Sequence, residues 1–130
     1  FLVRPFSKNS AKEMVHRPKV YYYDLGIRNA LLRRLESQLL VGDRGQIFEN
    51  TIAIQLKNSK GLDNLKYWRT KNQTEVDFVT IDSLGNLNGW EAKFVSTANT
   101  TSGLQAFETQ YHDLTKGTFL ITKNNFWEVL

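Results

Sequence analysis

Three strand-like segments in close succession constrain the fold of this chain more than any other feature. The segments LKYWRT (65–70), TEVDFVT (74–80) and LNGWEAKFV (87–95) are rich in the β-branched and aromatic residues that favour strands. The intervening KNQ and DSLGN segments contain residues typical of turns. We therefore predict a three-stranded meander over residues 65–95.

The chain before the meander predicts a helix with one apolar face. Asp43 followed by Gln46 resembles a capping box, so we expect a helix to start there and to run to about Lys57. The middle of its buried face is formed by Phe48, Ile52 and Leu56. Glu49 lies on a flank of this face and not on the polar side. A carboxylate there is costly to desolvate unless it meets a cation or hydrogen-bond donors.

The chain after the meander predicts a second helix followed by strands. One of the hydroxyl residues at 100–102 can cap this helix, whose apolar residues recur at helical spacing. These apolar residues are Leu104, Phe107 and Tyr111. The segments GTFLIT (117–122) and FWEVL (126–130) are predicted as strands. From residue 43 the predicted order is thus helix, three strands, helix and strand, with one more strand at the end.

Residues 1–36 predict a basic N-terminal extension. The segments LVRPF (2–6) and KVYYY (19–23) indicate a β-hairpin, and Asp24 can cap a helix over about 25–36. Residues 1–34 contain eight lysine and arginine residues against two acids. Such a basic arm suits a phosphate backbone, although a solvated surface is the alternative. The residues predicted to contact nucleic acid are Arg4, Lys8, Lys12, Arg17, Lys19, Arg69 and Lys71.

The composition is that of one soluble domain. A length of 130 residues fits a single domain, and 41% hydrophobic with 23% charged residues argues against disorder. The absence of cysteine excludes disulfides and thiolate metal sites, and it fits a cytoplasmic protein. No apolar run approaches the roughly 20 residues of a membrane span, so we expect no membrane association.

The turn between the second and third strands of the meander decides which side chains share a face. If residues 82–86 form the loop, Ile81 pairs with Leu87. In the same register Asp77 lies directly opposite Glu91, because alternate residues of a strand share one face. Carboxylates about 5 Å apart repel each other, so this pair destabilises the hairpin unless a positive charge lies between them.

A divalent cation would remove this repulsion. Magnesium prefers oxygen ligands and typically binds one or two carboxylates together with water and phosphate. Glu75 lies opposite Lys93 in this register, and Lys93 could hold the attacking water or offset charge in the transition state. Glu49 would hold the water shell of the metal. The alternative is an ordinary ion pair between Glu75 and Lys93, with the other two acids facing solvent.

These residues resemble the motif of the PD-(D/E)XK nuclease superfamily, whose shared core is αβββαβ. Asp77 stands at the acid of the second strand, although no proline precedes it. Glu91, Ala92 and Lys93 fill the (D/E)-x-K of the third strand, and Glu49 corresponds to a helix acid of many members. The resemblance implies an α/β restriction-endonuclease-like fold and magnesium-dependent hydrolysis of DNA, with manganese as a substitute. The implied metal ligands are Asp77, Glu91, the Ala92 carbonyl and Glu49.

Some polar residues have weaker claims to a role in this site. Glu75 is either a fourth acid or the partner of Lys93. Gln105 and Gln110 follow on the second helix, where some related nucleases use a glutamine to steady the metal, and a solvent-facing helix position is the alternative. The two histidines, at positions 16 and 112, have no partner at ligand spacing and are expected on the surface.

A closer resemblance covers almost the whole chain. It rests on the segments LVRPFSKNS, RPKVYYYDLGIRNALL, GQIFENTIAIQL, YWRTKNQTEVDFV and WEAKF. These are similar to the C-terminal, largely uncharacterised domain of a family of prokaryotic AAA-type ATPases. The resemblance implies an ATPase domain upstream in the same chain, and the start at Phe1 leads us to expect a fragment of that longer protein. No G-x-x-x-x-G-K-[ST] motif occurs here, so a P-loop is not expected within these residues.

The resemblance leaves two classes of function open. One is a metal-dependent nuclease domain acting on DNA. The other is a catalytically inactive docking or regulatory module for DNA or protein partners of the ATPase, because a fold alone does not imply a function. Assembly into a homo-oligomer is compatible with either class.

Overall fold

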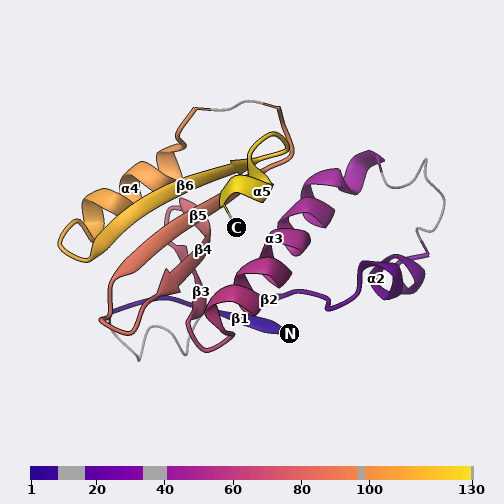
Figure 1. The fold of residues 1–130 in the computed structure, drawn as a ribbon, viewed down its shortest axis with the longest axis horizontal. Helices are drawn as coiled ribbons and strands as arrows, with labels where there is room; N and C mark the ends of the chain where they lie inside the picture. The colour runs from indigo at the N-terminus through magenta and orange to yellow at the C-terminus, as the bar shows by residue number, and fades with distance from the viewer. Residues whose placement is uncertain (9–16, 34–40, 97–98, 130) are drawn as a thin grey trace.

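A six-stranded mixed sheet with helices on both faces organises the computed structural model, which describes residues 1–8, 17–33, 41–96 and 99–129 (Figure 1). The strand order is β2-β1-β3-β4-β5-β6. The strands are β1 Leu2–Pro5, β2 Lys19–Val20, β3 Leu65–Arg69, β4 Glu75–Ile81, β5 Leu87–Lys93 and β6 Thr115–Thr122. The helices are α2 Leu25–Leu31, the 3₁₀ turn η1 Val41–Asp43, α3 Arg44–Lys60, α4 Ser102–Gln110 and α5 Phe126–Val129.

The predicted order of helix, three strands, helix and strand is confirmed between α3 and β6. Strands β3, β4 and β5 pair antiparallel, and β6 pairs parallel with β5 after the crossover through α4. Ile81 pairs with Leu87, so the predicted hairpin loop is correct. The Asp82 carboxylate closes that loop by accepting hydrogen bonds from the backbone N–H groups of Leu84 and Asn86, each at 2.8 Å. The α/β class is therefore confirmed.

The N-terminal strands belong to the main sheet. The predicted hairpin is confirmed, since β1 and β2 pair antiparallel. In addition, β1 pairs parallel with β3, which makes these residues part of the sheet rather than an extension of it. Asp24 caps α2 as predicted, by accepting from the Ile27 N–H at 2.9 Å. The helix ends at Leu31, earlier than predicted, and residues 34–36 of the predicted helix lie outside the described residues.

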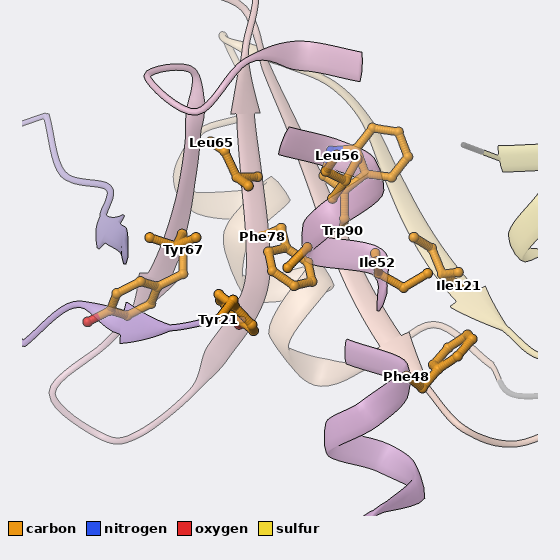
Figure 2. Close-up of a cluster of buried hydrophobic side chains, with 11 residues drawn as sticks. Tyr21, Phe48, Ile52, Leu56, Leu65, Tyr67, Phe78, Trp90 and Ile121 are labelled. Atoms are coloured by element: carbon orange, nitrogen blue, oxygen red, sulfur yellow. The ribbon is translucent and has the colours of Figure 1, made fainter. Parts of the chain in front are cut away.

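A hydrophobic cluster lies on each face of the sheet. Figure 2 shows the first, in which Phe48, Ile52 and Leu56 of α3 lie over Phe78, Trp90 and Ile121 of the strands. On the other face the cluster contains Leu104, Phe107, Tyr111, Trp68, Val76, Val79 and Leu87. The predicted buried faces of both helices are therefore confirmed. Each fully buried leucine or isoleucine stabilises the fold by about 1.5–3 kcal/mol, so these contacts hold α3 and α4 against the sheet.

The start of α3 differs from the predicted capping box. Asp43 precedes the helix, but its side chain makes no capping hydrogen bond. Its carboxylate instead lies 3.3 Å from Nη2 of Arg28, and the same Nη2 donates to Gln46 Oε1 at 3.0 Å. A buried guanidinium needs these acceptors, and it takes the two side chains that the capping box would have used. The helix also runs beyond Lys57, to Lys60.

The predicted strand at FWEVL is wrong. Residues Phe126–Val129 form the short helix α5. The reason lies in Asn125, whose side chain accepts from the Thr122 N–H at 2.7 Å and donates to the Leu120 carbonyl at 3.0 Å. These bonds turn the chain away from β6 and place Phe126 against the core, 6.0 Å from Phe48 between ring centroids. Within the described residues no helix combines the length and apolar character needed to cross a membrane.

Candidate functional site

One extra residue in β4 decides where the acids of this strand lie. The flanking register pairs are Lys66 with Val79 and Trp68 with Val76. Two β4 residues, Asp77 and Phe78, therefore lie opposite Tyr67 alone. Such a β-bulge interrupts the alternation of a strand and re-aims its side chains. Phe78 packs in the cluster under α3. Asp77 is directed to the same face, where its carboxylate and that of Glu49 on α3 both contact the ammonium of Lys19.

Glu91 points to the opposite face of the sheet. Its carboxylate accepts a hydrogen bond from the hydroxyl of Thr101, which caps α4. The ladder between β4 and β5 ends at the pair of Phe78 and Trp90, one step before the predicted pair of acids. The prediction that Asp77 and Glu91 face each other on one face is therefore wrong, because the bulge turns Asp77 toward α3.

The ammonium group of Lys19 lies at the centre of the acids on the α3 face. Its Nζ is 3.2 Å from Glu49 Oε1 and 3.4 Å from Asp77 Oδ1, and it also contacts the Glu75 carboxylate. Only 19% of the Lys19 side chain is exposed. We call these four residues the Lys19 cluster. A contact between Lys19 and nucleic acid stays a prediction, and the Lys19 ammonium already contacts three carboxylates.

Glu75 takes part in this cluster and not in the predicted pair with Lys93. Its carboxylate contacts both the ammonium of Lys19 and the guanidinium of Arg69. The predicted ion pair is wrong because Glu75 faces α3, whereas Lys93 contacts Glu91. Arg69 is partly exposed and adds a second positive charge at the edge of the cluster.

Two hydrogen bonds hold the cluster carboxylates in position. The Tyr21 hydroxyl donates to Glu49 Oε1 at 2.6 Å. The backbone N–H of Ala92 donates to Asp77 Oδ2 at 3.0 Å, in the place where the β4–β5 ladder has ended. The sequence did not indicate the role of Tyr21, because its position in a tyrosine-rich strand is equally typical of core packing.

The charges of the cluster shift the pKa values of its members. Burial raises the pKa of Asp77 to about 6, and Glu49 adds to this rise while Lys19 and the Ala92 N–H oppose it. Burial lowers the pKa of Lys19, but the surrounding carboxylates outweigh it, so the pKa is raised overall. Burial and then Glu49 raise the pKa of Tyr21, which keeps its proton and remains a donor. Three carboxylates thus share one buried ammonium, which favours further positive charge nearby.

A pocket of about 460 Å³ opens beside the cluster. Its charged lining residues are Lys19, Glu49, Glu75, Arg28 and Arg69, and Gln46 and Asn50 add side-chain amides. The pocket therefore presents carboxylates and cations to the same space. That combination suits a ligand that carries both a metal ion and a phosphate group.

Glu91 and Lys93 form an ion pair near the start of α4, and this pair interacts electrostatically with the Lys19 cluster, because Glu91 adds to the raised pKa of Asp77 and both Asp77 and Glu49 add to that of Lys93. Lys93 Nζ lies 2.8 Å from Glu91 Oε1, and the hydrogen bond to Glu91 raises the pKa of Lys93. Glu91 is buried, and its second carboxylate oxygen accepts from Thr101. These contacts link β5 to the start of α4.

Gly103 is a structural requirement that the sequence did not reveal. A Cβ atom at this position would lie 2.1 Å from the Glu75 carbonyl oxygen and 3.3 Å from Glu91 Oε2. The first turn of α4 therefore approaches the strand backbone as closely as only glycine permits. This close approach fixes the helix cap beside the carboxylate of Glu91.

The remaining basic residues predicted to contact nucleic acid lie apart from the cluster. Arg4, Arg17 and Lys71 are exposed. Lys8 is also exposed, and its ammonium lies over an aromatic ring near the end of α4. Lys12 lies outside the described residues. A contact between these residues and nucleic acid stays a prediction.

The polar residues of α4 face solvent. Gln105 and Gln110 are both exposed, in agreement with the alternative that they are ordinary helix surface positions. His112 pairs with the exposed Asp113 at 2.9 Å, as expected for a surface histidine. His16 lies outside the described residues.

The donor chemistry of the Lys19 cluster fits a hard divalent cation. Glu49 and Asp77 both direct an oxygen to the ammonium of Lys19, and oxygen is the ligand that magnesium prefers. In the described part of the chain, no three acidic or histidine side chains have the spacing of a formed metal site. All three cluster carboxylates contact the ammonium of Lys19. Glu91 contacts Lys93 and Thr101 rather than Lys19, and the ligand set implied by the motif, including Glu91 and the Ala92 carbonyl, stays a prediction.

Comparison with known proteins identifies one related family. A family model described as "Domain of unknown function (DUF4143)" matches residues 44–128, which include α3, the meander, α4 and β6. No curated protein and no solved structure matches the chain.

Proposed function

The chain belongs to the DUF4143 family, a domain of unknown function, and we propose that it is a metal-dependent phosphodiesterase acting on DNA. One observation carries the proposal: the carboxylates of Glu49, Glu75 and Asp77 converge on the ammonium of Lys19 beside a pocket. Clustered titratable groups with perturbed pKa values at a pocket are typical of active sites.

The order of the elements supports this proposal. The αβββαβ order from α3 to β6 is that of the PD-(D/E)XK core, to which the sequence motif also points. In that comparison Asp77 is the acid of the second core strand and Glu49 the acid of the first helix. Both residues lie in the Lys19 cluster, so two of the acids expected from the motif are together.

The chemistry of the site follows from its side chains. Asp77 and Glu49 would hold a magnesium or manganese ion, which would lower the pKa of bound water and polarise the phosphate. The Ala92 N–H and the Tyr21 hydroxyl orient these two carboxylates. Lys19 offsets negative charge on the phosphate, the role that the motif assigns to Lys93. We propose this exchange of lysines because Lys19 contacts the acids on the α3 face, while Lys93 contacts Glu91.

Basic residues at the rim of the pocket support a phosphate-bearing substrate. Arg69 lines the pocket and is partly exposed, and the exposed Lys71 lies two residues beyond it. Lysine and arginine side chains of this kind position a nucleic acid backbone without reading its sequence. An ATPase domain in the same full-length chain remains part of the proposal, as the sequence resemblance implies.

A cleavage assay with labelled and supercoiled DNA in magnesium or manganese tests the proposal. We expect Asp77→Asn and Lys19→Arg to lower the rate by about a hundredfold, since both disturb the groups around the metal. Glu91→Gln is the matched carboxylate control and should keep the rate within about threefold. Cleavage that survives Asp77→Asn would show a contaminating nuclease and overturn the proposal. If Glu91→Gln and Lys93→Ala lost activity while Lys19→Arg kept it, Glu91 and Lys93 would be the catalytic residues, as the sequence motif implies.

A docking or regulatory module is the second candidate. The observation that favours it is the ion pairing itself, because Lys19 and Arg69 pair with the cluster carboxylates and Lys93 pairs with Glu91. Under this proposal the acids stabilise the sheet, and the domain contributes binding surface to its ATPase. The same assay separates the candidates: wild-type protein that binds DNA or the ATPase but cleaves nothing with either metal is a docking module.

A further inference from the structure

A second pocket, of about 540 Å³, lies where the end of β1, the β3–β4 turn and the end of α4 meet. Its lining combines aromatic rings with cations and an amide. The residues used in the argument are Phe6, Trp68, Tyr111, Arg69, Lys71 and Gln110. A volume of this size is typical of sites for small organic ligands.

The pocket has an aromatic wall. Phe6 is half-buried, and its ring meets that of Tyr111 edge-on at 5.3 Å between centroids. The Tyr111 ring in turn meets Trp68 edge-on at 6.2 Å. Trp68 and Tyr111 are buried, so these contacts hold the half-buried Phe6 ring in a fixed orientation, and a planar ligand can stack on Phe6 without ordering a flexible side chain. Gln110 donates from Nε2 to the Tyr111 hydroxyl at 2.9 Å and adds a polar edge to the wall.

Cations surround this wall. Lys71 is exposed in the β3–β4 turn, and Lys8 places its Nζ 5.7 Å from the centroid of the Tyr111 ring. Arg69 lines this pocket and also the pocket beside the Lys19 cluster. A ligand in the aromatic pocket thus lies among three positive charges, one of which, Arg69, is paired with Glu75 of the Lys19 cluster. The chemistry required of the ligand is a planar ring joined to an anion.

We propose that this pocket binds an unpaired nucleobase of single-stranded DNA, with the adjacent phosphate directed to Arg69 and Lys71. Every base has a π face that can stack on an aromatic side chain, and such stacking tolerates any sequence. In a duplex these faces are covered by neighbouring bases, so only an unpaired or flipped base can enter. The inference rests on the proposed function for the choice of DNA as ligand, and it adds that the substrate is single-stranded at this point.

Binding measured without catalysis tests the inference. Fluorescence anisotropy in EDTA would compare a labelled single-stranded oligonucleotide, the same strand with abasic sites throughout, and a duplex of equal length. Wild-type protein should bind the single strand roughly five- to tenfold more tightly than the abasic strand, since only the bases are missing. Equal affinity for the two strands, or a preference for the duplex, would overturn the inference.

Two variants locate the binding to this pocket. Phe6→Leu should weaken single-strand binding roughly fivefold and leave abasic binding unchanged. Lys71→Gln should weaken both and reduce the salt dependence of affinity by about one phosphate contact. Phe94→Leu, an exposed phenylalanine that lines another pocket, is the matched control. Identical effects of Phe6→Leu and Phe94→Leu on folded protein would contradict the assignment.

The test separates this inference from the proposed function. Because EDTA removes the metal, a phenylalanine-dependent preference for single strands supports the pocket even if no DNA is cleaved. Conversely, metal-dependent cleavage by wild-type protein with no base-dependent binding would leave the proposed function standing and reject the nucleobase site.

Discussion

Lys19 Nζ lies 3.4 Å from Asp77 Oδ1, although 58 residues separate them in the chain. The contact depends on the pairing of β2 with β1, of β1 with β3 and of β3 with β4. It therefore joins the N-terminal hairpin to the acids of the meander. The energetic consequences of this link can be measured independently of any activity.

Replacing Lys19 by methionine should destabilise the protein. The substitution keeps an apolar stem but leaves three partly buried carboxylates without their shared ammonium. We expect the free energy of unfolding at pH 7 to fall by about 2 kcal/mol, measured by urea denaturation. The matched control is Lys71→Met in an exposed turn, with an expected change below about 0.5 kcal/mol. Equal midpoints for the two variants would show that the cluster does not stabilise the fold.

The raised pKa of Asp77 should make stability depend on pH. Its folded-state pKa is about 6 against an ordinary value of 3.8, so the folded protein binds more protons than the unfolded chain between these values. The stabilising contribution of the protonated carboxyl is full below about pH 4 and is lost as the pH rises through 6.

Asp77→Asn removes this titration and provides the measurement. From pH 4 to pH 7 we expect the stability of wild type relative to the variant to fall by on the order of 2 kcal/mol, in chemical denaturation with EDTA present. A relative stability that rises over this range would mean that Lys19 dominates the environment of Asp77.

Gly103→Ala should destabilise the start of α4. The added methyl group would lie 2.1 Å from a backbone oxygen of β4, which cannot move without distorting the sheet. We expect a loss of about 2–3 kcal/mol in thermal or urea unfolding. Gly45→Ala is the control, because nothing lies within 4 Å of its added methyl group and the position is in α3. That control should stabilise the protein by up to about 1 kcal/mol.

Manganese should stabilise the protein through the Lys19 cluster. An ion that binds the folded state alone raises the unfolding midpoint with its concentration. We expect a rise of several degrees for wild type at millimolar manganese, a loss of this rise in Glu49→Gln and its retention in Glu91→Gln. An equal rise in wild type and Glu49→Gln would place the metal elsewhere.

The meander could be predicted from sequence because its signals are local. Alternating strand residues and a loop closed by Asp82 fixed the pairing of Ile81 with Leu87. The faces of the acids could not be predicted in the same way. The β-bulge places one extra residue in β4 between two of its pairs with β3. Such a shift by one residue moves a side chain to the other face of the sheet.

The position of Lys19 depends on contacts distant in sequence. Nothing in the KVYYY segment indicates that its hairpin joins the sheet beside β3. Likewise, the residues of FWEVL favour a strand, but the segment forms a helix because the hydrogen bonds of the Asn125 side chain turn the chain after β6. Glu49 was the informative exception, because a carboxylate among apolar helix residues signals a buried partner even when that partner cannot be named.

The placement of β1 between β2 and β3 has a practical consequence for anyone who trims this protein to its recognised family region. The match covers residues 44–128, whereas both N-terminal strands precede it. Truncation at that boundary would remove β1, the parallel neighbour of β3. The backbone N–H and C=O groups of β3 would then be unpaired at an exposed edge, which promotes aggregation. The shortened polypeptide would also lack Lys19, the cation that pairs with the three partly buried carboxylates. Insolubility of such a fragment would therefore be a consequence of the truncation and not a property of the intact domain.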